Sequence, residues 1–286
     1  MVSHLMTCSW SLFRAEAELS SDYVAELDVR RSGIEPLGDK MPLPHSNGPA
    51  DDENTICSIA EHAIRRLLNR VHFSLYSPVP EMNLSEPADP TRIWQSLGLQ
   101  KVQWLSCELN RQLEEWYNSI PESLRPVKGT SALPNDRLRV LRIRYYSARH
   151  IIHRPYVIQT IMRRWEASSP ASPMTPTSGH YGEPGSVIME MCRICIDSCL
   201  SYLYNAVEMI DRRSPYLWSF SQGCLACLVL LWMADGCAGL RHLVPNMHPI
   251  QRRVLASLRK WATRSSSFDA ETRIIERLVF SSPSAT

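Results

Sequence analysis

The chain has 286 residues, of which 44% are hydrophobic and 21% charged. This is the balance of a globular protein, and it excludes a wholly disordered one. At this length, folding buries roughly three quarters of the surface that the unfolded chain exposes, so stability does not require disulfides or metals. The 31 basic and 29 acidic residues leave a net charge of +2, which provides no broad positive field for nucleic acid or anionic membranes.

The sequence lacks the usual marks of membrane insertion or export. Its longest wholly apolar run, residues 224–234, is shorter than the roughly 20 residues that cross a bilayer. The start of the chain has neither a basic stretch nor a continuous apolar segment, so it does not resemble a signal peptide. We therefore expect an intracellular, soluble protein without a membrane partner, whose nine cysteines are reduced thiols.

Helical periodicity dominates the first half of the chain. A short helix is predicted over residues 8–20, and a loop rich in Gly, Pro and Asp follows it. The next predicted helix, residues 55–76, follows three acidic residues that suit a helix start. Its expected apolar stripe consists of Ile56, Ile59, Ala63, Leu67 and Val71. A helix over residues 102–120 ends at Pro121, and its expected core face consists of Val102, Leu105, Leu109, Leu113, Trp116 and Ile120.

The same periodicity continues through the second half. A helix over residues 137–154 has an expected core face of Leu138, Leu141, Tyr145, Ala148 and Ile152. Pro155 is expected to break or kink it, with a second, shorter helix after it, because proline lacks the N–H and clashes with the preceding turn. Residues 167–186 are rich in Pro, Ser and Gly and predict a disordered insert. Four later helices are predicted around residues 191–204, 217–234, 252–261 and 270–279. The predicted fold class is all-α, an irregular multi-helix bundle with long Pro/Ser-rich loops.

Five cysteines lie in two of these helices: Cys192, Cys195 and Cys199, then Cys224 and Cys227. Zinc would join Cys192 or Cys195 to the later pair, but 28 residues separate Cys195 from Cys224, more than the roughly 15–20 of common four-cysteine sites. A redox pair needs an exposed helix start beside a βαβ unit, and the pattern predicts none. We therefore favour core packing, with zinc and redox sites as alternatives. The predicted core stripe consists of Ile188, Cys192, Cys195, Cys199, Tyr202, Ala206 and Met209.

Catalytic motifs are absent from the sequence, including G-x-S-x-G, H-E-x-x-H and G-x-G-x-x-G. His150 and His153 have helical spacing, but a tetrahedral site needs more ligands, so they are interpreted as polar residues on a helix face. Glu114 and Glu115 are adjacent, so they point to different faces and are interpreted as solvated charges. The sequence thus predicts no catalytic, cofactor-binding or metal-binding residue.

Two segments, "LNRQLEEWYNSIPESLRP" and "LRIRYYSARHIIHRP", resemble the middle homology region of fungal transcription factors of the zinc binuclear cluster (Zn(2)-C6) class. The residues that carry the resemblance are Leu113, Trp116, Tyr117, Pro121, Leu124 and Pro126, followed by Arg144, Tyr145, Tyr146, Ala148, Arg149, Arg154 and Pro155. Three further stretches in the same order extend the resemblance from about residue 8 to about residue 280. The residues involved are packing aromatics, helix stops and charge-pairing arginines, and none is a nucleophile.

The resemblance implies a regulatory domain of a nuclear transcription factor that is not an enzyme. It would act through proteins of the transcription machinery or a regulator subunit, and through a small effector held between helices. The family's six-cysteine DNA-binding cluster is not present in residues 1–286, so we expect the carboxy-terminal part of a regulator without cofactors or specific DNA binding of its own. An all-α metal-dependent enzyme and a fragment without autonomous function are the alternatives. Tyr216, Trp218 and Trp232 are interpreted as core residues rather than as the wall of an effector cavity.

Overall fold

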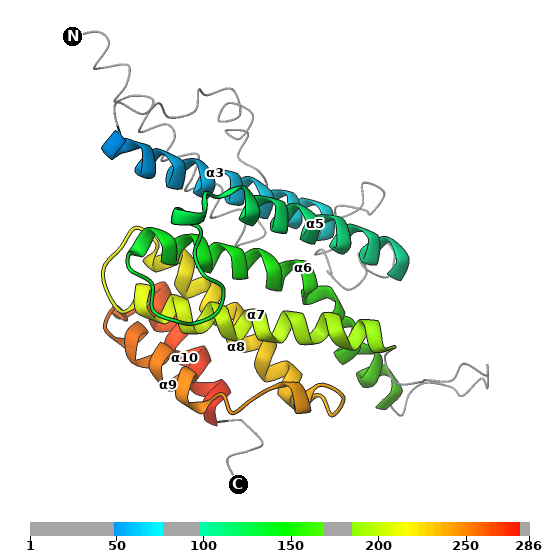
Figure 1. Cartoon of the computed structure of the whole chain (residues 1–286). Coiled ribbons are helices and arrows are strands. Elements are labelled where there is room, and N and C mark those ends of the chain that lie inside the picture. Colours follow the sequence, from blue (N-terminus) through cyan, green and yellow to red (C-terminus); the bar gives the residue numbers. More distant parts are fainter. Residues whose placement is uncertain (1–48, 77–97, 169–184, 281–286) are drawn as a thin grey trace, which may run out of the picture.

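The structure is a computed structural model and describes residues 49–76, 98–168 and 185–280 (Figure 1). Within these ranges the chain forms α-helices and short 3-10 turns, with no strand, which confirms the predicted all-α class. The helices are α3 (Pro49–Tyr76), α5 (Leu99–Ser119), α6 (Asp136–Ser168), α7 (Ser186–Ile210), α8 (Leu217–Gly236), α9 (His248–Arg259) and α10 (Ser267–Phe280). The 3-10 turns are Glu122–Leu124 and Arg241–Leu243.

The helices stack in order around α6 and α7 (Figure 1). The helices α3 and α5 pack on each other and on α6, while α6 also contacts α7 and α8. On the other side, α7 packs on α8 and α9, and α10 covers α8 and α9. Because α6 has neighbours on several sides, most of residues 138–153 are buried, including charged ones such as Arg142 and Arg144. The centre of the molecule is therefore a helix that must satisfy polar groups in its interior.

The predicted core faces hold for α5 and α6 and only partly for α3. Every expected residue of α5 is buried or partly buried, and all five expected residues of α6 are buried. In α3, Leu67 and Val71 are buried as expected, but the prediction for Ala63 is wrong because its side chain is exposed. The neighbouring Ile64 is buried in its place. The buried stripe of α3 consists of Cys57, Ala60, Ile64, Leu67, Leu68, Val71 and Leu75, which have the i, i+3, i+4 spacing of one helix face.

Of the two outcomes expected at Pro155, the break into two helices is wrong, because α6 continues through Pro155 to Ser168. A proline at this position leaves the carbonyl of Ile151 without its usual N–H donor. The hydroxyl of Tyr76, on α3, donates a hydrogen bond to that carbonyl at 2.6 Å. The helix changes direction in its second half (Figure 1). A contact from another helix thus replaces the missing hydrogen bond and lets α6 continue.

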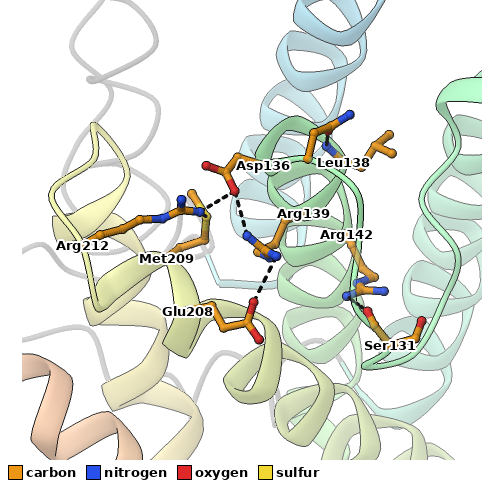
Figure 2. A network of polar contacts seen from close by, with 9 residues as sticks. Ser131, Asp136, Leu138, Arg139, Arg142, Glu208, Met209 and Arg212 are labelled. Carbon is orange, nitrogen blue, oxygen red and sulfur yellow. Dashed lines mark hydrogen bonds and ion pairs between the residues drawn. The ribbon is translucent and has the colours of Figure 1, made fainter.

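Polar contacts at the start of α6 join it to the end of α7 (Figure 2). Arg139 pairs with Asp136 at 2.7 Å and with Glu208 of α7 at 3.0 Å. Arg212, just after α7, also pairs with Asp136. The side chain of Asn135 accepts a hydrogen bond from the N–H of Leu138 at 2.9 Å and so caps the amino end of α6. These contacts hold one end of the α6–α7 pair in place.

The side chain of Tyr202, on α7, lies directly against the backbone of α8 at Gly223. A Cβ atom on Gly223 would lie 2.1 Å from the hydroxyl of Tyr202, so only glycine fits beneath this ring. Among the described residues, α8 is the one helix long and apolar enough to cross a membrane. However, 56% of its most apolar window is buried within the fold, and the core helix of a folded domain meets the same criterion.

Several predictions concern residues outside the described ranges. The helix over residues 8–20 lies there, as does the insert over residues 167–186 except at its ends. Residues 167 and 168 belong to α6, residue 185 precedes α7, and residue 186 begins α7.

Candidate functional site

The α5 residues that resemble the fungal family join α5 to α3 and to the turn that follows α5. The indole N–H of Trp116 donates a hydrogen bond to the carbonyl of Ala60 at 2.9 Å. The hydroxyl of Tyr117 donates to the carbonyl of Pro126 at 2.7 Å, across the helix stop. Because these bonds tie helix ends and loops to the core, the motif aromatics have the packing role expected from the sequence.

The second motif segment extends this polar network. Tyr146 accepts a hydrogen bond from the N–H of Gly129 at 2.6 Å. The side chain of Asn205, on α7, donates to the carbonyl of Gly129 at 3.1 Å. Gly129 has φ of +104°, a backbone conformation that favours glycine. The loop between α5 and α6 is thereby held against both α6 and α7.

The acidic pair of α5 separates as expected onto two faces, but its interpretation as solvated charge holds for one member alone. Glu115 is exposed and pairs with Arg111. Glu114 is partly buried and accepts hydrogen bonds from Tyr145 at 2.6 Å and Lys128 at 2.8 Å. Burial alone would raise the pKa of Glu114, but these two hydrogen bonds outweigh it and lower the pKa.

The cysteine stripe of α7 is part of the core, as predicted. Cys192, Cys195 and Cys199 have no exposed surface, and Cys224 and Cys227 of α8 are equally buried. Tyr202, Ala206 and Met209 are also buried, while Ile188 is partly buried. No disulfide joins the cysteines in the described part of the chain. Burial explains the residue type but does not explain which sulfur atoms meet.

Cys199 and Cys227 meet a histidine from a third helix. A ring nitrogen of His150, on α6, and the sulfur atoms of Cys199 and Cys227 all lie within 4.8 Å of one another. The three side chains are buried, with His150 only 3% exposed. The imidazole packs edge-on against Tyr202 at 5.8 Å between ring centroids. Its Nδ1 is buried and has no hydrogen-bond partner among the described residues. These three residues are called the His–Cys–Cys cluster below.

The thiols in and beside the cluster differ in the direction of their pKa shifts. Burial raises the pKa values of Cys195 and Cys227. Burial would do the same to Cys199, but hydrogen bonds from Cys195, Cys227 and His150 outweigh it and lower the pKa of Cys199. The geometry therefore brings one soft, thiolate-favouring sulfur together with a second thiol and an imidazole.

The pairs considered from the sequence do not form this cluster. Cys192 lies near Thr160, 3.6 Å from its hydroxyl, and burial raises the pKa of Cys192 to about 11. His153 points its Nδ1 to the carbonyl of Arg149 at 2.7 Å and does not join His150 at one site. Sequence reasoning missed the combination of His150 with Cys199. The sequence held no signal for it, because the three residues come from three separate helices.

A separate pocket lies between α8, α9 and the loop that joins them. It has a volume of about 280 Å³ and is lined by Trp232, Asp235, Val244, Pro245, Asn246, Met247, His248 and Gln251. The indole N–H of Trp232 and the amide oxygen of Gln251 are buried without a hydrogen-bond partner among the described residues. The prediction that Trp232 is a plain core residue is therefore wrong. Tyr216 and Trp218 do not line this pocket.

Comparison of the whole chain with protein-family models, with curated proteins and with solved structures finds no match.

Proposed function

We propose that the chain is the regulatory, non-catalytic domain of a fungal transcription factor of the zinc binuclear cluster class. It acts in the nucleus through protein partners of the transcription machinery or a regulator subunit, and a small effector controls it. The observation that carries this proposal is the structural use of the motif residues. Trp116, Tyr117, Tyr145 and Tyr146 bond to loops and neighbouring helices, and none of them lines the pocket.

The pocket beside Trp232 supports the effector part of the proposal. Ligand pockets combine apolar walls with a few polar groups that fix orientation. The wall of this pocket combines the apolar Val244 and Met247 with the polar Asp235 and Asn246. A compact molecule with an apolar body and a polar group would suit this lining. A ligand here would join α8 to α9 and so influence the surface that both helices present.

The regulatory part is tested by fusing the full chain to an unrelated DNA-binding domain in a yeast reporter strain. We expect the fusion to change reporter expression several-fold relative to the DNA-binding domain alone. Reporter expression equal to that of the DNA-binding domain alone would favour a fragment without autonomous function and contradict the proposal. A gel-shift titration of the isolated chain should show no sequence-specific, salt-sensitive DNA binding.

The effector part is tested by screening compact metabolites that have an apolar body and a polar group for a shift in the thermal unfolding midpoint of the chain. A ligand of this pocket should shift the midpoint less in Trp232→Phe, because the smaller ring changes the wall of the pocket. Trp104→Phe is the matched control because Trp104, on α5, is 66% exposed and lies outside the pocket. Equal loss in both variants would contradict the assignment of the pocket.

A further inference from the structure

The His–Cys–Cys cluster has features that core packing alone does not explain. Core packing requires only small apolar volume, yet the cluster includes an imidazole that hydrogen-bonds Cys199 and whose Nδ1 is buried without a partner among the described residues. Leaving a polar atom unpaired in the interior costs stability. Three side chains from three helices, α6, α7 and α8, nevertheless bring metal-binding atoms within 4.8 Å of one another. We propose that His150, Cys199 and Cys227 bind one Cu(I) ion in a buried, three-coordinate site.

The ligand set selects the kind of metal. Thiolates are soft ligands that favour Cu(I) and Zn(II), and imidazole suits both metals. Structural zinc, however, is held by four protein ligands, and catalytic zinc keeps a water in the fourth position. The cluster supplies three ligands and is closed to solvent. The next sulfur, that of Cys195, contacts Cys199 and the backbone carbonyl of His150, the latter at 3.4 Å, and does not belong to the group of ligand atoms that all lie within 4.8 Å of one another. A soft ion that accepts three ligands fits this arrangement best.

The charge around the cluster favours a monovalent ion. Two thiolates and one Cu(I) carry a net charge of −1, whereas two thiolates and Zn(II) are neutral. Arg154, one turn after His150, interacts electrostatically with Cys195 and Cys199. Its polar contacts among the described residues are to Tyr76, through the hydroxyl at 3.2 Å and the ring at 4.6 Å, and not to a carboxylate. The guanidinium therefore balances the negative charge of a Cu(I) site, as buried charges require.

Binding at the cluster is a simple exchange without a redox step. The thiols of Cys199 and Cys227 release their protons to solvent as two Cu–S bonds form, and a neutral ring nitrogen of His150 forms the Cu–N bond. The copper enters and stays as Cu(I). This inference is independent of the proposed regulatory function, because it concerns the ligand set alone.

The test is an anaerobic titration of the full chain with Cu(I), delivered from a coloured Cu(I) chelator that competes for the ion. Cys8 and Cys107 are replaced by serine in every sample, because Cys107 is exposed and Cys8 lies outside the described residues. We expect one Cu(I) per chain. Cys199→Ser and Cys227→Ser should each weaken affinity by more than about ten-fold. The matched control is Cys192→Ser, which is on the same helix and equally buried but outside the cluster, and it should leave affinity unchanged.

Three results would overturn the proposal. Affinity unchanged in Cys199→Ser and Cys227→Ser would place the ion elsewhere. A loss in Cys195→Ser as large as that in Cys199→Ser would indicate a four-ligand site. Binding of one Zn(II) in place of Cu(I) would show that the assignment of the metal as Cu(I) is wrong. Helicity measured by circular dichroism shows whether each variant folds. If one does not fold, the chain with serine at positions 8 and 107 alone still decides, because equimolar Cu(I) should raise its unfolding midpoint and an unchanged midpoint would refute binding.

Discussion

The two polar sides of α6 are built in different ways. Toward α5, Tyr145 bonds to a carboxylate and Tyr146 accepts a backbone N–H, so these buried groups have partners. Toward α7 and α8, His150 lies among thiols and hydrogen-bonds Cys199, while its Nδ1 has no hydrogen-bond partner among the described residues. A paired polar group is explained by stability, whereas an unpaired one costs stability unless something binds it. The comparison therefore places the proposed binding site on the side of α6 that carries His150, called the thiol side below. The side that carries Tyr145 and Tyr146, called the tyrosine side, has a structural role.

The largest loss of stability is expected from a substitution at Gly223, where the side chain of Tyr202 packs against α8. Gly223→Ala would place a Cβ atom 2.1 Å from the hydroxyl of Tyr202. Tyr202 is 1% exposed and lies edge-on to both His150 and Phe220, so its ring has little room to move. We expect a loss of about 3 kcal/mol in the free energy of unfolding, measured with urea.

The control for this variant is Gly236→Ala, on the same helix. A Cβ atom on Gly236 meets nothing within 4 Å. The change should be neutral or slightly stabilising, because alanine restricts the unfolded chain. Equal stability of the two variants would show that α7 and α8 do not meet as closely as described.

Two carboxylates, those of Glu114 and Glu271, show the same contrast between a paired and an unpaired buried group. The contrast predicts how the free energy of unfolding depends on pH. Glu114 is paired, whereas one oxygen of Glu271, on α10, is buried without a partner among the described residues. Burial raises the pKa of Glu271 to about 7, although hydrogen bonds from Ser221 and Gln222 oppose the shift. The folded chain therefore holds this proton more tightly than the unfolded chain. Its contribution to stability is complete at low pH and is lost as the pH rises toward about 7.

Glu271→Gln should remove this contribution. Relative to wild type, the variant should gain about 2 kcal/mol of unfolding free energy between about pH 5 and about pH 8. Subtracting wild type cancels the opposite slope from His72 and His153, whose pKa values burial lowers to about 3 and about 4. Glu276→Gln, also on α10, is the control, because its carboxylate pairs with Arg259 instead. A difference that does not change with pH would contradict the raised pKa.

A smaller loss is expected on the tyrosine side. Tyr145→Phe removes the hydrogen bond to Glu114 and keeps the ring, so it should cost about 1–2 kcal/mol of unfolding free energy. Tyr204→Phe is the control, because Tyr204 is 37% exposed on α7. If both variants kept wild-type stability, the tyrosine side would not have the architectural role assigned to it.

The smallest effect is expected at His150 itself. In metal-free protein, His150→Leu removes an unpaired buried Nδ1 but also the hydrogen bond from His150 to Cys199, and these two effects oppose each other, so stability should stay within about 0.5 kcal/mol of wild type. Denaturant unfolding in the presence of a copper chelator measures this. A loss comparable to that of Tyr145→Phe would show that His150 is architectural after all.

The sequence predicted the helices well because periodicity is local, and the expected faces of α5 and α6 are buried as a result. It failed where a distant partner decides the outcome. Pro155 does not end α6, because Tyr76 of another helix supplies the missing donor. The predicted stripe of α3 used Ala63 in place of Ile64, because the two residues are adjacent in sequence and both apolar. The His–Cys–Cys cluster joins three helices, and no spacing within one segment encodes it.

The most direct measurement of the thiol side is copper X-ray absorption on the Cu(I)-loaded chain, with Cys8 and Cys107 replaced by serine. It reports the oxidation state of the metal and the number and type of atoms bound to it. The account predicts Cu(I) bound by two sulfur atoms and one imidazole nitrogen, with the nitrogen signal absent in His150→Leu. A first shell of sulfur alone, or one that includes oxygen from water, would contradict the three-ligand site.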